Sequence, residues 1–179
     1  MDRSLLAQRY ALALYEYAEE QKQSRQVMKT MKLLAGIWKQ MPAFKKALED
    51  PLLDPEKKME LLRSLAEDDK KEVCMRFFRL VAAHNRIFLL GRMARAYVEL
   101  WNQKHNIVRA ELITVGKVGT ELSRQLEELV QKSVGEKKVE FNRLYNPDII
   151  GGFIMQVEDL RIDASVLREL EYIKMNLLQ

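Results

Sequence analysis

The sequence predicts a mainly helical protein with a small α/β part. A six-helix bundle over residues 1–105 is expected to precede a β-α-β-β-β-α domain over residues 106–179. Three observations predict this division. Apolar residues recur at the helical period of about 3.6 as far as Lys104. The period then changes to about two near Asn106. Finally, the stretch Asn146–Ser165 combines a Gly-Gly pair with two β-type runs.

The expected helices of the bundle are separated by short breaks. Asp54 is a good N-cap and Pro55 suits a first helical position, so a helix is expected to start there. Asn85 is expected to break the chain and to cap the sixth helix. The other expected helices span residues 4–21, 24–39, 43–49, 69–84 and 86–104.

The first and fifth helices carry more apolar surface than one packing interface needs. Such a helix either lies centrally in the bundle or serves both the core and a partner. In the first helix the expected core stripe is Leu6, Tyr10, Ala13, Leu14 and Tyr17, widened by Leu5, Leu12, Tyr15 and Ala18. In the fifth helix the stripe is Val73, Phe77, Leu80 and Val81, widened by Cys74, Met75, Phe78 and Ala82.

The second domain shows strand alternation around Val108–Leu112 and Val139–Phe141, and two further strands are expected within Asn146–Ser165. Gly151-Gly152 predicts a bulge or a strand-entry turn, and either Asp163 or Ser165 is expected to cap the last helix. The helix over residues 120–133 is expected to bury Leu122, Leu126, Leu129 and Val130. The last helix has an apolar face formed by Val166, Leu170, Ile173 and Leu177.

The composition indicates a protein without catalytic residues, cofactor or metal. Cys74 is the one cysteine, and His84 and His105 are the only histidines, so neither a zinc-binding spacing nor a catalytic Cys-His spacing is present. No apolar run is long enough to predict a membrane span. The first residues, Met1–Ser4, do not have the pattern of a secretory signal.

The charge distribution leaves one alternative open. Residues 70–109 contain nine basic and two acidic residues, dispersed at helical spacing. This pattern is typical of a solvated helix face. Together with the Gly116–Gly119 loop, it also permits a small basic RNA-binding protein, whose affinity for RNA would fall steeply with salt.

Three stretches together resemble the delta subunit family of F-type ATP synthases, called the oligomycin-sensitivity-conferring protein in mitochondria. Ala7–Ala18 resembles the opening helix of this family, and Asn85–Ile87 is similar to the start of its sixth helix. Asn146–Pro147, Ile150–Phe153 and Arg161–Ser165 resemble its carboxyl-terminal signature. Ala164 departs from this signature, where the family usually has Gly, so no positive φ is expected at that position.

The resemblance implies a non-catalytic stator subunit in the peripheral stalk, located at the cytoplasmic face of a bacterial membrane only through the complex. In this family the first domain binds amino-terminal segments of the alpha subunits, in a groove between the first and fifth helices. The second domain grips the ends of the b subunits, and nucleic acid is not an expected partner. The resemblance places the groove at Tyr10, Ala13, Tyr17, Phe77 and Leu80. It assigns a structural role to Gly151, Gly152, Asp163 and Ser165.

Overall fold

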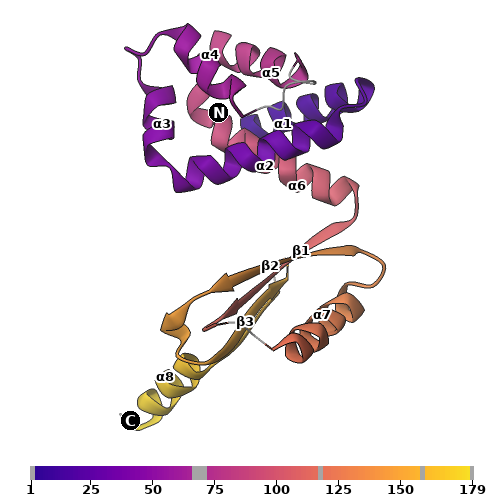
Figure 1. The fold of residues 1–179 in the computed structure, drawn as a ribbon, viewed down its shortest axis with the longest axis vertical. Helices are drawn as coiled ribbons and strands as arrows, with labels where there is room; N and C mark the ends of the chain where they lie inside the picture. The colour runs from indigo at the N-terminus through magenta and orange to yellow at the C-terminus, as the bar shows by residue number, and fades with distance from the viewer. Residues whose placement is uncertain (1–2, 66–71, 117–118, 158–159, 178–179) are drawn as a thin grey trace. The chain divides into compact units, whose positions relative to one another are not determined.

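The chain forms two compact units, Met1–Asn102 and Gln103–Gln179. The predicted boundary, between residues 105 and 106, lies a few residues later. The computed structural model describes residues 3–65, 72–116, 119–157 and 160–177, without the side chains of residues 120–122 and 177. Figure 1 shows a helical first unit and a second unit built on a sheet, so the described residues are mainly helical with a small sheet.

The helices of the first unit have bounds close to the predicted ones. They are α1 (Arg3–Glu20), α2 (Ser24–Gln40), α3 (Pro42–Glu49), α4 (Pro55–Arg63), α5 (Glu72–Ala83), the short 3₁₀ helix η2 (Ile87–Leu89) and α6 (Leu90–Lys104). The predicted start of the fifth helix, at Asp69, lies outside the described residues. Asp54 caps α4 as predicted, since its side chain accepts a hydrogen bond from the Glu56 N–H at 3.0 Å.

Asn85 ends α5 instead of capping the next helix. Its φ is 54°, and the Arg86 N–H donates to the Val81 carbonyl while the Asn85 N–H donates to the Ala82 carbonyl. This pair of bonds closes a helix through a left-handed residue, a role in which asparagine is second only to glycine. The predicted single helix from Arg86 is therefore wrong at its start, where η2 precedes α6.

The core-facing stripe of α1 differs from the predicted one. Its buried residues are Ala7, Ala11, Leu14 and Ala18. Of the predicted stripe only Leu14 is buried, whereas Tyr10 and Tyr17 are half-buried and Ala13 is exposed. Three alanines in this stripe bring the α1 backbone close to its neighbours α2 and α5. The tyrosines are too large for that interface and lie along its edge.

The remaining helices bury most of the apolar residues expected in the core. Val27, Met31 and Leu34 of α2 are buried as predicted. In α5 the predicted stripe is wrong for Leu80, which is exposed, while Cys74 and Phe78 are buried in its place. Gly91 of α6 packs directly on the Trp38 ring, since a Cβ atom there would lie 2.4 Å from Trp38 Cδ1.

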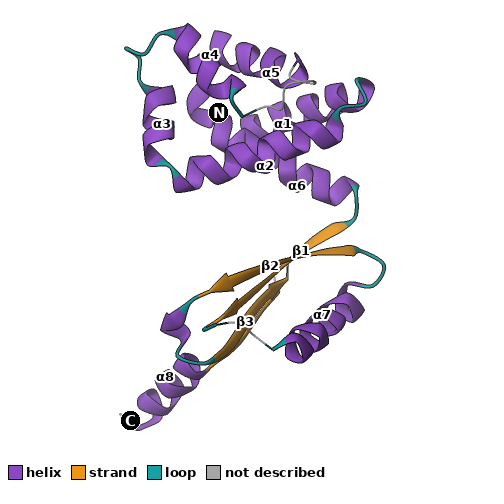
Figure 2. Ribbon diagram, viewed as in Figure 1, coloured by secondary structure: helices purple, strands orange, loops and turns teal. Residues whose placement is uncertain are grey.

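The second unit is a four-stranded sheet in the order β2-β1-β3-β4. Its elements are β1 (Ile107–Thr114), α7 (Thr120–Val134), β2 (Lys138–Tyr145), the 3₁₀ helix η3 (Pro147–Ile149), β3 (Gly152–Val157), β4 (Leu160–Ser165) and α8 (Val166–Leu177). β1 and β2 are parallel and the other pairs are antiparallel. A parallel pair needs a long crossover, and α7 provides it (Figure 2).

α7 covers one face of this sheet. Leu126 and Val130 cluster with Ala110, Leu112 and Met155, and Val139 and Phe141 pack against the cluster from β2. The predicted face of α7 is wrong for Leu129, which is exposed. Leu122 is among the side chains outside the description. A short helix over a narrow sheet buries only the residues that point directly at β1 and β3.

Candidate partner-binding site

The predicted partner-binding residues lie on the adjoining edges of α1 and α5. These helices pack against each other, and the rings of Tyr10 and Phe77 meet edge to face, with centroids 6.3 Å apart and planes at 68°. Aromatic pairs favour this geometry because the positive edge of one ring faces the negative face of the other. We define the α1–α5 seam as the surface formed by Tyr10, Ala13, Tyr17, Phe77 and Leu80.

The seam residues differ in how much surface they offer. Phe77 is only 7% exposed and also packs on Phe78, so it belongs to the floor of the seam. Leu80 is 49% exposed although it is apolar. Ala13 is exposed, and Tyr10 and Tyr17 are half-buried. A Leu side chain left half in water forgoes hydrophobic stabilisation that a docked apolar partner would supply.

Two arginines hold the tyrosine hydroxyls of the seam. Arg86 Nη1 donates to the Tyr10 hydroxyl at 2.5 Å, and its guanidinium carbon lies 5.5 Å from the centroid of the Tyr10 ring. Arg76 Nη1 donates to the Tyr17 hydroxyl at 2.8 Å and also pairs with Glu72. Hydrogen bonds from a charged donor are stronger than neutral ones. Both tyrosine hydroxyls of the seam are therefore fixed before any partner binds.

Sequence reasoning did not find Arg76 and Arg86. Arg76 was counted only within a basic stretch, and Arg86 was otherwise noted only as part of the Asn85–Ile87 resemblance. The available signal was that a half-buried tyrosine hydroxyl requires a donor or acceptor. The partner that supplies it lies far away in the sequence, because Arg76 and Tyr17 are 59 residues apart.

The residues assigned a structural role lie at the two ends of the β3–β4 hairpin, with Gly151 and Gly152 at its start and Asp163 and Ser165 at its end. Gly152 has a φ of +73°, and a Cβ atom at this position would lie 2.1 Å from the Ala164 carbonyl oxygen. A Cβ atom on Gly151 would lie 2.9 Å from Val166 Cγ2. The Gly-Gly pair thus allows a close backbone approach and leaves no room for a ligand. Ala164 lies within β4 and has no positive φ, as expected.

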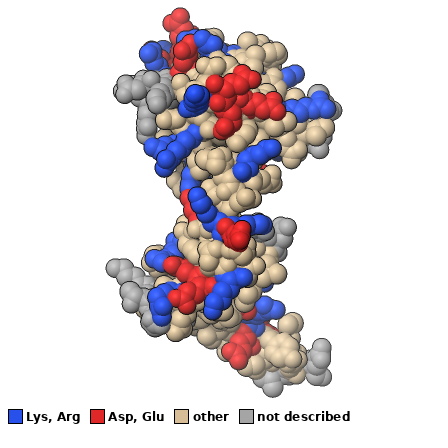
Figure 3. Space-filling model, turned by 90° about the vertical axis from the view of Figure 1, so that its right-hand side faces the viewer, with Lys and Arg blue, Asp and Glu red and all other residues tan. Residues whose placement is uncertain are grey.

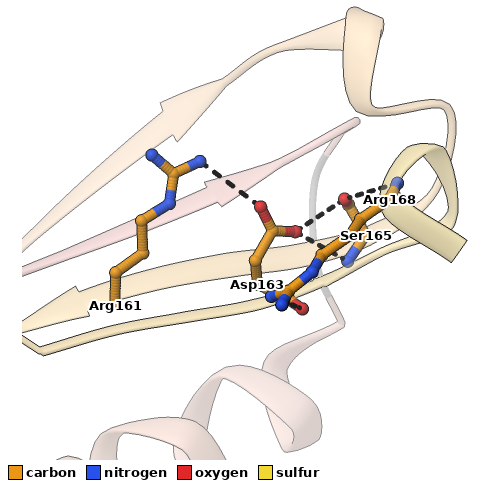
Figure 4. A network of polar contacts seen from close by, with 4 residues as sticks. All are labelled: Arg161, Asp163, Ser165 and Arg168. Atoms are coloured by element: carbon orange, nitrogen blue, oxygen red, sulfur yellow. Dashed lines mark hydrogen bonds and ion pairs between the residues drawn. The ribbon is translucent and has the colours of Figure 1, made fainter. Parts of the chain in front are cut away.

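Asp163 and Ser165 together cap the last helix. Ser165 Oγ accepts a hydrogen bond from the Arg168 N–H at 3.3 Å, while Asp163 Oδ1 accepts from the Ser165 hydroxyl at 2.6 Å and from the Ser165 N–H at 3.2 Å (Figure 4). Hydrogen bonding to the Ser165 side chain, aided by the backbone of Ser165 and by Arg161, lowers the pKa of Asp163. Ser165 is the N-cap, and Asp163 holds its hydroxyl in position.

Among the residues that the structure describes, the predicted apolar face of α8 is exposed. Leu170 and Ile173 of this face are exposed, and Tyr172 and Met175 are exposed on other sides of the helix. The side chain of Leu177 lies outside the description. A helix whose apolar face remains in water is typical of a surface that packs against another chain.

The described residues offer no place for a metal ion, since nowhere among them do three His, Cys, Asp or Glu side chains come together. None of the helices in the described part of the chain is long and apolar enough to cross a membrane.

The residues of the RNA-binding alternative are described only in part, because Lys70, Lys71, Lys117 and Val118 lie outside the described ranges. Figure 3 shows one face of the molecule, on which acidic side chains lie among the basic ones in both units. A phosphate-binding surface needs a concentrated basic patch, and the face in Figure 3 has none.

Comparison with known proteins identifies the family. The family described as ATP synthase delta (OSCP) subunit matches residues 6–177. The chain belongs to this family. The family predicted from the resemblance is therefore confirmed. Membership of this family favours a stator subunit over the RNA-binding alternative.

Individual members of the delta family match along the whole chain. An ATP synthase subunit delta from Azobacteroides pseudotrichonymphae is 36% identical over 176 residues, covering 97% of this chain and 98% of the relative. One from Parabacteroides distasonis is 32% identical over 179 residues, covering 100% and 99%. A chain from the mitochondrial ATP synthase hexamer of Toxoplasma gondii matches with a TM-score of 0.67 at 18% identity, covering 97% of this chain and 98% of that one. The chain is thus a non-catalytic, peripheral-stalk component of ATP synthase with the delta (OSCP) fold.

Proposed function

We propose that this protein links the alpha subunits of the catalytic head to the b subunits of the stalk, so that the head does not turn with the central rotor. In this proposal the six-helix bundle predicted over residues 1–105 binds an amino-terminal helix of an alpha subunit along the α1–α5 seam. The domain predicted over residues 106–179 binds the ends of the b subunits. In a bacterium the protein would lie at the cytoplasmic face of the cell membrane, held there by the complex.

The observation that carries the proposal is the seam itself. Its floor is a preformed contact between Tyr10 and Phe77, and beside it Leu80 remains half in water. An amphipathic helix binds such a surface by placing its apolar positions over the exposed apolar side chains. The fixed tyrosine hydroxyls support the same interpretation, because a preorganised surface loses less conformational entropy on binding.

The exposed face of α8 supports the second half of the proposal. Val166, Leu170 and Ile173 lie on one side of α8, at helical spacing, and all three are exposed. An apolar segment of a b subunit packed on this face would remove these side chains from water. The two binding surfaces lie on separate units, as a link between two partners requires.

The test is a titration of the full chain with two fluorescein-labelled peptides, followed by anisotropy. One peptide is the amino-terminal segment of the cognate alpha subunit, and the other is the carboxyl-terminal segment of the cognate b subunit. Each is expected to bind, and neither should displace the other. Absence of alpha-peptide binding at tens of micromolar, which corresponds to about −6 to −7 kcal/mol, would contradict the proposed site on the first unit.

A further inference from the structure

One end of the α1–α5 seam carries two arginines that have no acidic partner among the residues that the structure describes. Arg86 lies against Tyr10, and Arg3 lies over the Phe88 ring with its guanidinium carbon 5.7 Å from the centroid. Both are next to the amino-terminal half of α1, since Tyr10 and Arg3 belong to it. Among the residues that the structure describes, no Asp or Glu forms an ion pair with either arginine. Arg76 differs, because it is paired with Glu72.

Arg86 is half-buried before any partner binds. An arginine has five N–H donors, and within the described part of the chain the acceptor that Arg86 meets is the Tyr10 hydroxyl. A helix docked on the seam would remove more water from this guanidinium. Removing water from a charge costs free energy unless an opposite charge replaces the water.

We propose that the seam selects a helix with a carboxylate facing Arg86, in addition to apolar residues facing Leu80 and Phe77. This inference rests on the proposed function and adds the charge chemistry of the partner. The carboxylate lies at the end of the bound helix that is next to Arg3 and Phe88. Arg86 is then a specificity-determining residue, because a helix with an amide at that position leaves the guanidinium unpaired.

The alternative acceptor on a helical partner is the set of free carbonyls at its carboxyl end, which also carry partial negative charge. Those carbonyls are present in every helix and would not distinguish one sequence from another. The experiment therefore changes the side chains of the peptide and leaves its backbone unchanged.

A double-mutant cycle tests the proposal. The amino-terminal alpha-subunit peptide is compared with a version in which every Asp and Glu is replaced by Asn or Gln. Each is titrated with the full chain and with Arg86→Gln. We expect either change alone to weaken binding about tenfold, and both together to weaken it little further, because the two groups form one interaction. Arg25→Gln on α2, which removes the same charge outside the seam, should change the affinity less than about twofold.

The outcomes separate this inference from the proposed function. If neither peptide binds the unmodified chain, the proposed function of the seam fails. If the unmodified peptide binds but its amide version binds equally well, the alpha-subunit peptide is still a ligand and the carboxylate partner is wrong. The inference would also be overturned if the losses of affinity from the peptide change and from Arg86→Gln simply added. It would equally fail if the cognate alpha-subunit peptide contained no Asp or Glu. The peptide-side change does not depend on whether Arg86→Gln folds.

Discussion

Gly152 and Ala164 approach so closely that a Cβ atom on Gly152 would lie 2.1 Å from the Ala164 carbonyl oxygen. The two residues belong to paired strands, and Gly152 has a φ of +73°. Two features therefore exclude a side chain at position 152, namely the positive φ of Gly152 and the nearby Ala164 backbone. Neither can relax by a side-chain rotation.

Replacing Gly152 by Ala should destabilise the second unit by at least about 3 kcal/mol, since the new methyl group would collide with backbone at a conformation that alanine avoids. Urea unfolding followed by circular dichroism measures this loss. Gly116→Ala is the matched control in the same unit, because no heavy atom lies within 4 Å of its Cβ position. Equal stabilities for the two variants would contradict the close approach.

Leu80 gives the clearest test of the seam. Leu80→Asp should weaken binding of the alpha-subunit peptide about tenfold or more, because an apolar contact is lost and a carboxylate is desolvated. The change should cost less than about 1 kcal/mol of stability, since Leu80 is already 49% exposed.

Leu33→Asp on α2 is the matched control, because Leu33 is 48% exposed and lies outside the seam. It should leave peptide affinity unchanged. Phe77 is a poorer choice for this purpose, since it is 7% exposed and a charge there would destabilise the core. Equal loss of binding in the Leu80 and Leu33 variants would remove the seam from consideration.

Ile173→Asp should abolish binding of the b-subunit peptide and leave binding of the alpha-subunit peptide unchanged. Ile173 is 47% exposed on the apolar face of α8. A charge on this face interrupts the apolar surface without entering the core of the second unit. Anisotropy titrations with both labelled peptides measure the effect, and Leu80→Asp should show the reverse pattern. Loss of both peptides in one variant would indicate unfolding instead of a local effect.

Cys74 should resist thiol reagents in the folded protein. Its side chain is 2% exposed, and burial raises the pKa of the thiol to about 11. At pH 8 the reactive thiolate is therefore scarce as well as inaccessible. Ellman's reagent should react slowly with the native chain and rapidly in concentrated urea. Fast stoichiometric reaction without denaturant would contradict the buried position of Cys74 in α5.

Asp163→Asn should lower stability at neutral pH, and the difference from the unmodified chain should disappear in acid. The folded-state pKa of Asp163 is lowered, mainly by the hydrogen bond from the Ser165 side chain. The contribution of the carboxylate is thus fully present above its unfolded pKa of about 3.9 and is lost as the pH falls through the lower folded value. Urea midpoints at several pH values measure this. A stability difference between the two chains that stays constant down to pH 2 would refute this prediction. Glu171→Gln on α8 is the control, since it removes a carboxylate outside this cap.

The sequence by itself determined which segments are helical and which are strands. The period of the apolar residues changes near Asn106, and the observed elements change from helix to strand at Ile107. Local chemistry was also readable, because capping depends on neighbouring residues. Asp54 before Pro55 and Ser165 before the last helix are two such cases. The family could be recognised for a related reason, since its signature lies in a few short stretches.

Only the tertiary structure decided which side of each helix faces the core. In α1 every side carries apolar residues, so the pattern did not show that Ala7, Ala11 and Ala18 would be buried while Tyr10 and Tyr17 lie at the edge. The pairing of Arg86 with Tyr10, which are 76 residues apart, was equally hidden. Periodicity shows which residues lie on the same side of a helix. The choice between two apolar faces depends on the size of the neighbouring helices' side chains, and these are brought together only by folding.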